Sequence, residues 1–208
     1  YIPCTNIEEG KSVVNAKFFA EIVRKSPSDK ITVTVDENNM ASIVSGESNF
    51  SIIAIPAEEF PEIPEVTNSI RFELNASVLK SMIRQTIFAV AESDSKPVHQ
   101  GSLFNFYSGL LDVVSVDGYR LAKRTEPVET EEDISFVVPG KTLNEINRLL
   151  KENDEMVEVH AGQRNIKFVI DSYTVVSSLL EGEFLNYRST IPTETSLTAI
   201  VNTREMIE

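Results

Sequence analysis

The chain repeats itself, and this internal repeat restricts the possible fold more than any other feature of the sequence. When residues 13–60 are moved by 124 positions onto residues 137–184, matching side chains fall in register without a gap. The matches pair Val13-Val14 with Val137-Val138, Lys17 with Lys141, Glu21-Ile22 with Glu145-Ile146, Arg24 with Arg148, Val33 and Val35 with Val157 and Val159, and Glu59-Phe60 with Glu183-Phe184. Self-similarity at a fixed spacing marks a repeated structural unit. We therefore predict one order of elements twice: strand, helix, three strands, and an acidic loop with a phenylalanine.

The local patterns support each element of this unit. The apolar residues of the first helix recur at helical spacing and stand before a proline that ends the helix: Phe18, Phe19, Ile22, Val23 and Pro27. The stretch ITVTV alternates, so Ile31, Val33 and Val35 are expected to face a core. The second copy predicts a helix from about Lys141 to Lys151, followed by the strands MVEVH, IKFVI and TVVSSLL.

A second, shorter similarity suggests where the units divide. The stretch FELNASVLKSMI (72–83) resembles AIVNTREMI (199–207) when Asn75 is placed on Asn202, so a strand and a helix are expected to begin again at about residue 198. We therefore expect residues 1–68 to be the C-terminal half of one unit, residues 69–193 a complete unit, and residues 194–208 the start of a third. The sequence then reads as a fragment of a longer protein. The alternative is a natural two-domain protein with frayed ends.

Composition excludes several classes of protein. The 41% of hydrophobic residues and 25% of charged residues are those of a globular protein, and no apolar run approaches the roughly 18 residues of a membrane helix. With Cys4 as the one cysteine and His99 and His160 as the two histidines, neither a disulfide framework nor a Cys/His metal cluster is expected. We expect a cytoplasmic protein without a metal ion or cofactor.

The sequence also lacks the motifs of an enzyme. Gly162 and Gly182 are isolated turn residues rather than parts of a phosphate-binding loop. No nucleophile motif accompanies the serines, and acidic pairs such as Glu58-Glu59 and Glu131-Glu132 are expected to be solvated. We therefore predict a non-catalytic protein; a nucleotide-dependent enzyme, the third possibility, has no motif in its favour.

The charges are distributed unevenly. The formal net charge of −13 argues against nucleic-acid binding, yet the three predicted helices (16–25, 76–90 and 140–151) carry eight basic residues against two acidic ones. The basic residues are Lys17, Arg24, Lys25, Lys80, Arg84, Lys141, Arg148 and Lys151. Their spacing places them in stripes beside the apolar faces, which predicts a surface for non-specific contact with phosphates.

Two other interpretations of these stripes remain open. Lysine and arginine are good helix formers whose charged ends are simply solvated. A generic acidic α+β scaffold that binds a protein partner and never meets DNA would also fit. Burial of the basic side chains, or their pairing with carboxylates, would favour the scaffold.

Several longer motifs resemble the bacterial DNA polymerase III beta subunit, the sliding clamp. They are FSIIAIPAEEFPEIPEV (50–66), FAVAESDSKPVHQGSLF (88–104), VDGYRLAKR (116–124), VVPGKTLNEINRLLK (137–151) and LLEGEFLNYRSTIP (179–192). The resemblance implies an α+β clamp fold, with repeated antiparallel sheets outside and paired helices on the inner face. In this family two subunits of three such domains form a closed ring that encircles duplex DNA and tethers the polymerase. A fragment without the third domain is not expected to close that ring.

The resemblance also implies a pocket for the peptide tails of the polymerase, the clamp loader and repair proteins. By position its residues are His99, Val116, Gly118, Tyr119, Arg120, Leu121, Leu185, Ser189 and Thr190. An apolar wall of Val116, Leu121 and Leu185 beside Tyr119 and Arg120 suits a short apolar peptide. The chain departs from its relatives at His99, where they usually have an aliphatic residue, and at Leu185, where they usually have proline. Without the resemblance, VDGYR would be only a tight Asp-Gly turn.

Two further regions are assigned by the same resemblance. Lys96 and the loop 93–99 correspond to a loop that approaches DNA. Phe50 and Ile52 correspond to the edge strand through which full-length subunits form a head-to-tail dimer, as unpaired strand edges readily do. The alternative for Phe50 and Ile52 is that they face the core of their own domain.

Overall fold

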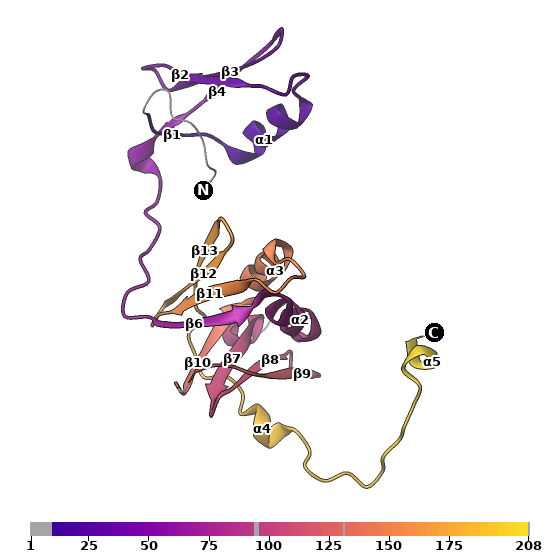
Figure 1. The fold of residues 1–208 in the computed structure, drawn as a ribbon. Helices are drawn as coiled ribbons and strands as arrows, with labels where there is room; N and C mark the ends of the chain where they lie inside the picture. Colours follow the sequence, from indigo (N-terminus) through magenta and orange to yellow (C-terminus); the bar gives the residue numbers. More distant parts are fainter. Residues whose placement is uncertain (1–9, 94–95, 131, 208) are drawn as a thin grey trace. The chain divides into compact units, whose positions relative to one another are not determined.

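The computed structural model describes residues 10–93, 96–130 and 132–207. It divides into two compact units, an N-terminal unit that ends at Ile63 and a C-terminal unit from Pro64 to Glu208 (Figure 1). Each unit is described by itself. The expected boundaries after residues 68 and 193 remain predictions.

The N-terminal unit consists of one helix and a small antiparallel sheet. Its elements are β1 (Ser12–Val13), α1 (Ala16–Lys25), β2 (Thr32–Val35), β3 (Met40–Ser45), β4 (Ser48–Ile53), β5 (Ile55–Pro56) and the 3-10 turn η1 (Ala57–Glu59). The sheet has the order β2-β3-β4, and β1 pairs with β5. Asn15 begins the helix, because its side-chain oxygen accepts hydrogen bonds from the backbone N–H groups of Lys17 and Phe18.

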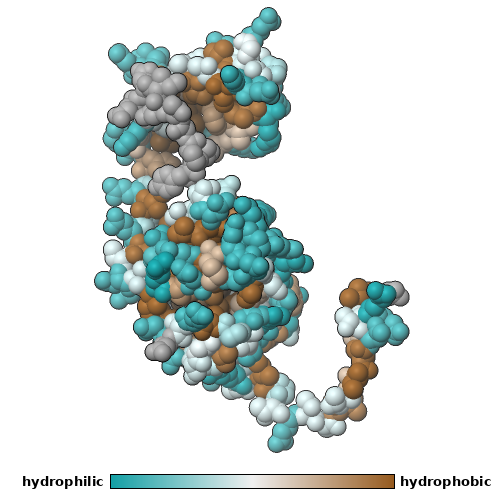
Figure 2. All heavy atoms as spheres, in the orientation of Figure 1, coloured by the Kyte–Doolittle hydropathy of each residue, from teal (hydrophilic) through white to brown (hydrophobic). Residues whose placement is uncertain are grey.

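The core of the N-terminal unit is thin. Ala41 and Ile43 of β3 are fully buried, whereas Val33 and Val35 of β2 are each 42% exposed. Val33 and Val35 lie opposite Ile43 and Ala41 in the strand register and share the face of these buried residues, as predicted, but that face is incompletely covered at β2. The reason is that β2 is an outer strand of a three-stranded sheet, and alternation selects a face of a strand but does not ensure that the face is covered. Figure 2 shows hydrophobic atoms reaching the surface of this unit.

The C-terminal unit contains two four-stranded antiparallel sheets, with the orders β10-β7-β8-β9 and β13-β12-β11-β6. Its strands are β6 (Ile70–Asn75), β7 (Gly101–Tyr107), β8 (Leu110–Val116), β9 (Leu121–Pro127), β10 (Ile134–Pro139), β11 (Met156–Ala161), β12 (Asn165–Ile170) and β13 (Tyr173–Ser178). Its helices are α2 (Ala76–Thr86), α3 (Gly140–Leu149), α4 (Tyr187–Thr190) and α5 (Thr203–Ile207), with 3-10 turns η2 (Ile87–Ala89) and η3 (Pro97–Gln100). The order helix, then three antiparallel strands, occurs as α1–β4 and again as α3–β13, so the predicted repeat and the α+β class are confirmed.

A single large core joins the sheets to the two longer helices of this unit. Helices α2 and α3 pack against each other and contact strands of the sheet β10-β7-β8-β9 (Figure 1). Leu79 of α2 and Leu143 and Ile146 of α3 are fully buried in this core. The rings of Phe104 and Phe136 stack there with their centroids 5.8 Å apart. Burying such large side chains is the main stabilising contribution.

The strand edges of the C-terminal unit are not equivalent. Strands β10 and β13 contact each other, and beyond β13 the backbone N–H of Leu180 donates to the carbonyl of Val137 on β10 at 2.9 Å. This leaves β6 and β9 as the outward edges of the two sheets.

The segment after α4 departs from the prediction. Helix α5 forms and is capped by Asn202, which accepts hydrogen bonds from the backbone of Arg204 and Glu205. The strand expected from about residue 198 does not form, because a strand requires a hydrogen-bonded neighbour. Ile200 is accordingly 98% exposed, and Figure 2 shows hydrophobic atoms along this segment. Among the described helices, none is both long enough and apolar enough to span a membrane.

Candidate functional site

The predicted basic stripe of the N-terminal unit lies at the surface. Lys17, Arg24 and Lys25 of α1 are all exposed. Lys25 forms an ion pair with Glu21 at 2.7 Å, and the hydrogen bond from Lys25 together with its charge lowers the pKa of Glu21. Because both side chains are exposed to solvent, this i,i+4 pair is weak, and Lys25 remains able to exchange partners.

The C-terminal unit brings its basic helix residues together on α2 and α3. Lys80 is half-buried and donates to the carbonyl of Leu150 at 2.8 Å, where it satisfies the C-terminal end of α3. Lys80 therefore stabilises the packing of the two helices. This structural role was not predicted for Lys80, which was predicted to face DNA. Arg84, Lys141, Arg148 and Lys151 are exposed.

Most of these exposed cations have carboxylate partners. Arg84 lies 3.5 Å from Glu152, Arg148 lies 2.8 Å from Glu145, and Lys151 lies 3.1 Å from Asp171. The hydrogen bond to Asp171 raises the pKa of Lys151. Pairing of this kind is what the scaffold alternative required. The pairs are nevertheless solvent-exposed, so each holds its cation weakly and leaves it accessible to phosphate.

The predicted DNA-approaching loop is described only in part. Lys96 is exposed and directly precedes η3, whose first residue is Pro97. Residues 94 and 95 of this loop lie outside the described residues.

The stretch VDGYR forms a tight turn between β8 and β9. The carboxylate of Asp117 accepts hydrogen bonds from the backbone N–H groups of Tyr119 and Arg120, both at 3.1 Å, and from Arg120 Nε at 2.8 Å. These bonds, the one from the Tyr119 backbone first, lower the pKa of Asp117. Gly118 has a φ of +87°, which favours glycine. The turn leaves the Tyr119 side chain 100% exposed.

The apolar wall of the predicted pocket is only partly accessible. Leu185 is 38% exposed, Leu121 is half-buried, and Val116 is 4% exposed. Val116, which was predicted as part of the apolar wall, is therefore almost wholly covered, and Leu121 and Leu185 are the accessible residues of that wall. The His99 ring meets the edge of Phe184 with centroids 5.8 Å apart, which connects η3 to the segment that carries Leu185.

The hydroxyl groups of the predicted pocket are engaged locally. Ser189 Oγ and Thr190 Oγ1 both donate to the carbonyl of Asn186, at 2.8 Å and 3.2 Å. Both side chains therefore stabilise the short helix α4. A cavity of about 650 Å³ lies against this segment, but of the predicted pocket residues it includes only Leu185.

A small apolar cluster unites the segments that carry the predicted pocket residues. It consists of Val98, Leu103, Val114, Val137 and Tyr187, with Leu121, Leu180 and Phe184 packed against it. Val98 precedes His99, Phe184 precedes Leu185, and Leu121 ends the Asp-Gly turn. The structure thus joins the end of the turn, η3 and α4 through one apolar cluster.

The sequence interpretation missed a buried polar group beside this cluster. Asp112 on β8 is fully buried and accepts hydrogen bonds from Thr125 Oγ1 at 2.5 Å and from Tyr187 Oη at 2.7 Å. Burial opposes ionisation of Asp112, but the bonds from Thr125 and Tyr187 and the charge of Lys123 hold its pKa below the ordinary value. The charged residue inside the apolar run LLDVVSV was the available signal, because carboxylates are rarely buried unless they are paired.

The predicted dimer residues occupy an edge strand. Strand β4 is an outer strand of its sheet, and Phe50 and Ile52 point to the side of α1, where they line a hollow of about 290 Å³ together with Phe18 and Ile22. The hollow is largely apolar. The side chains therefore face their own unit, as the alternative had it, and among the described residues no strand pairs with the outer edge of β4.

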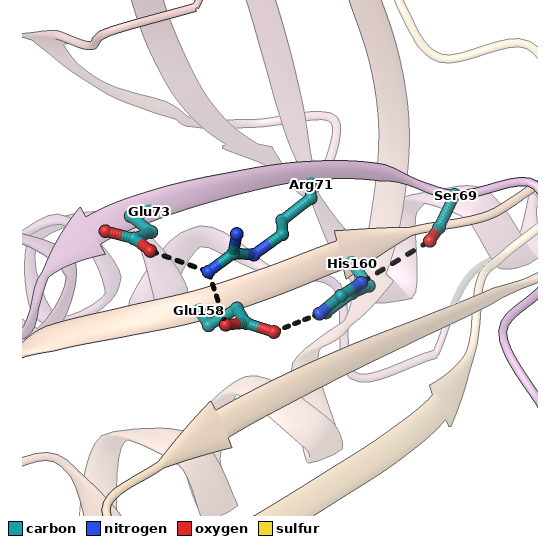
Figure 3. Close-up of polar contacts among 5 residues, drawn as sticks. All are labelled: Ser69, Arg71, Glu73, Glu158 and His160. Atoms are coloured by element: carbon teal, nitrogen blue, oxygen red, sulfur yellow. Dashed lines mark hydrogen bonds and ion pairs between the residues drawn. The ribbon is translucent and has the colours of Figure 1, made fainter.

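A second polar network crosses strands β6 and β11 (Figure 3). His160 contacts Glu158 through Nε2 and lies 3.5 Å from Ser69 Oγ through Nδ1, while Arg71 pairs with Glu158 at 2.7 Å and with Glu73 at 2.9 Å. The bond from His160 and then that from Arg71 lower the pKa of Glu158. Glu158 is shared with Arg71, and the Ser69–His160 contact is long. The network is therefore better explained as a set of cross-strand interactions that stabilise the sheet than as a nucleophilic triad.

Comparison with known proteins agrees with this architecture. Residues 2–64 match the family described as the DNA polymerase III beta subunit, N-terminal domain, and residues 73–186 match its central domain. The beta sliding clamp of Halalkalibacterium halodurans is 34% identical over 205 residues, which cover 97% of this chain and 54% of that protein. The chain spans about half the length of the curated relatives it matches.

Solved structures give the same result. A putative DNA polymerase III beta subunit from Eubacterium rectale is similar with a TM-score of 0.84 and 34% identity, over 91% of this chain and 53% of that one. A sliding clamp from Pseudomonas aeruginosa bound to griselimycin is similar with a TM-score of 0.84 and 30% identity, over 91% of this chain and 52% of that one. Two adjacent domain matches and the shared fold lead to one conclusion. The chain belongs to the DNA polymerase III beta subunit family.

Proposed function

We propose that this chain is part of a sliding clamp, a non-catalytic cytoplasmic protein that encircles duplex DNA and tethers the replicative polymerase. The observation that carries the proposal is the pairing of α2 and α3, which places Arg84, Lys141 and Arg148 on neighbouring helices of an acidic protein, with Lys151 just after the end of α3. A ring cannot dissociate from DNA without opening, so a tethered polymerase keeps a high effective concentration at its substrate. Weak phosphate contacts are sufficient for such a ring and allow it to slide.

The DNA-facing role of the helices is tested by charge reversal. We expect a fluorescein-labelled DNA duplex to bind the chain weakly at low salt and to be released as salt is raised, because every phosphate contact displaces counterions. Substitution Arg148→Glu should weaken binding severalfold at low salt. Fluorescence anisotropy over a salt series measures both effects.

Arg164→Glu is the matched control. Arg164 is also exposed and also lies near a carboxylate, Glu181 at 3.7 Å, but it lies in the turn between β11 and β12 rather than on a helix. Both substitutions change the net charge equally, so a general charge effect would weaken binding equally in the two variants. That outcome, or tight binding that persists in high salt, would contradict the sliding surface and favour the acidic scaffold.

We further propose that the Asp-Gly turn, η3 and α4 form one side of a pocket for partner peptides. Its support is the apolar cluster that joins these three segments and the full exposure of Tyr119 beside them. Because a related clamp binds griselimycin, this compound is a suitable probe. In the full-length protein, Tyr119→Ala and Arg120→Ala should weaken griselimycin binding, as measured by surface plasmon resonance, without lowering the melting temperature. Unchanged affinity would remove both residues from the pocket.

Self-association in the full-length protein is proposed to use the β4 edge. A strand with an open backbone edge accepts a strand from a second molecule, and the apolar hollow beside Phe50 and Ile52 would bury side chains of that molecule. Replacing Ile52 by lysine should shift the full-length protein from dimer to monomer in sedimentation experiments. A dimer that persists at low concentration would place the interface elsewhere.

A further inference from the structure

Tyr187 occupies the centre of the region that carries the proposed pocket. Its ring is 5% exposed and belongs to the apolar cluster with Val98 and Leu103. Its hydroxyl group donates to Asp112 Oδ2 at 2.7 Å and accepts from Asn105 Nδ2 at 3.0 Å. The hydrogen bond to Asp112 spans 75 positions in the sequence and connects α4 to the middle of β8.

Asp112 is held for this contact by its own sheet. It lies opposite Asn105 of β7 and Thr125 of β9 in the strand register. Tyr107 Oη at 3.1 Å and Lys123 Nζ at 3.3 Å also bond to Asp112 Oδ2. A buried carboxylate that accepts several hydrogen bonds is rigidly oriented, and bonds to a charged acceptor are stronger than neutral ones.

Among the described residues, few other side-chain hydrogen bonds connect the segment around Tyr187 to the sheet. In the part of the chain that the structure describes, the side chains of Ser189 and Thr190 bond locally, to the carbonyl of Asn186 that directly precedes α4, and both are exposed. Arg188 is exposed as well and rests on the ring of Tyr107 at 4.0 Å. Leu185 precedes Tyr187 by two positions, and its carbonyl accepts from the Tyr187 backbone at 2.7 Å. The position of Leu185 is therefore coupled to that of Tyr187.

We propose that the Asp112–Tyr187 hydrogen bond is a latch that fixes the segment Leu185–Thr190 on the sheet and thereby positions one wall of the partner-peptide pocket. Tyr187 and Asp112 are positioning residues, since neither reaches the surface where a peptide would bind. The second half of this inference rests on the proposed function of the pocket, whereas the first half concerns the latch alone.

The latch is tested with two tyrosine variants. Each variant removes one of the two hydroxyl groups that donate to Asp112 Oδ2. Tyr187→Phe breaks the bond between α4 and the sheet but keeps the ring in the apolar cluster. Tyr107→Phe is the matched control, because Tyr107 and Asp112 lie on adjacent strands of one sheet. Amide hydrogen exchange of residues 184–191 should accelerate about tenfold in Tyr187→Phe, the factor expected for a hydrogen bond to a charged group, and less than about twofold in Tyr107→Phe.

A double variant separates a specific bond from a general loss of packing. If the latch is the bond itself, Asp112→Asn combined with Tyr187→Phe should exchange no faster than the more severe single variant. Additive acceleration would overturn the latch, as would equal acceleration in the two tyrosine variants or unchanged exchange in Tyr187→Phe. Melting curves of every variant verify that the unit remains folded.

Griselimycin affinity of the full-length protein tests the positioning role. It should fall about tenfold in Tyr187→Phe and remain unchanged in Tyr107→Phe. Faster exchange with unchanged affinity would overturn the positioning role. If Tyr119→Ala also leaves the affinity unchanged, the proposed pocket itself has failed, while the exchange data still decide whether the latch exists.

Discussion

Replacing Gly101 by alanine should separate the strands that it joins. Gly101 begins β7 and pairs with Pro139 of β10. An added Cβ would overlap the backbone carbonyl oxygen of Val138 and would lie 2.9 Å from both Leu180 Cδ1 and Val137 Cγ1. The φ of Gly101 is −139° and its ψ is 174°, which any residue adopts, so the substitution introduces no backbone strain. The effect is therefore one of packing alone.

The size of the effect follows from what must move. Overpacking in a well-packed core costs about 1–3 kcal/mol, and the cost here should be near 3 kcal/mol because a paired backbone carbonyl cannot turn aside as a side chain does. In a unit of the size of Pro64–Glu208, each kcal/mol lowers the melting temperature by about 2–4 °C, so a decrease of about 6–12 °C is expected. Differential scanning calorimetry measures it directly.

Gly140 provides the matched control for this experiment. Its added Cβ would lie 3.0 Å from Val90 Cγ1 and 3.2 Å from the carbonyl of Gln100. The Val90 side chain can shift, and alanine at the start of α3 gains up to about 1 kcal/mol of helix propensity over glycine. Gly140→Ala should therefore change stability by less than about 1 kcal/mol. A melting temperature of Gly101→Ala within about 2 °C of the wild type would refute the packing argument.

Three further changes should have defined effects. Leu79→Ala removes a fully buried side chain of α2 and should cost about 2–5 kcal/mol in urea unfolding, whereas a cost below about 1 kcal/mol would mean that the core is loose. Asn75→Ala removes the acceptor for the backbone of Ser77 and Val78 and should cost about 1 kcal/mol, which Asn75→Asp should restore in the same assay. Because folding lowers the pKa of Asp112, its charge stabilises the fold above the unfolded pKa, and this contribution is lost as pH falls through the folded pKa. The stability difference between the wild type and Asp112→Asn should therefore shrink in acid, and a constant difference between neutral pH and about pH 3 would contradict the ionised state.

Local patterns in the sequence predicted the elements that local physics determines. The apolar spacing of the first helix is a local pattern, so α1 was predicted at residues 16–25 and is found at Ala16–Lys25. The second helix was expected to continue to residue 90, but α2 ends at Thr86 and a 3-10 turn follows. Helix ends depend on a few weak bonds and are less clearly encoded than helix interiors.

Contacts between segments that are distant in the sequence could not be predicted from local patterns. Val116 was assigned by the resemblance to the apolar wall of the pocket, and it is 4% exposed because both faces of the run LLDVVSV are covered, one by the main core and the other by the cluster around Tyr187. The carboxylates Glu152 and Asp171, which pair with cations of α2 and of the end of α3, come from neighbouring loops. Spacing along a helix predicts which face is solvated but not which loop lies beside it.

The strand edges of the two units have different consequences in solution. The outward edges of the C-terminal unit carry charged side chains, Arg71 and Glu73 on β6 and Lys123, Arg124 and Glu126 on β9. The outer strands of the N-terminal sheet, Thr32–Val35 and Ser48–Ile53, contain none. Charged side chains on an edge strand oppose pairing with a strand of another molecule, whereas an uncharged edge permits such pairing. Aggregation of this chain should therefore begin in the N-terminal unit, and solubilising substitutions belong there rather than in the better-packed half.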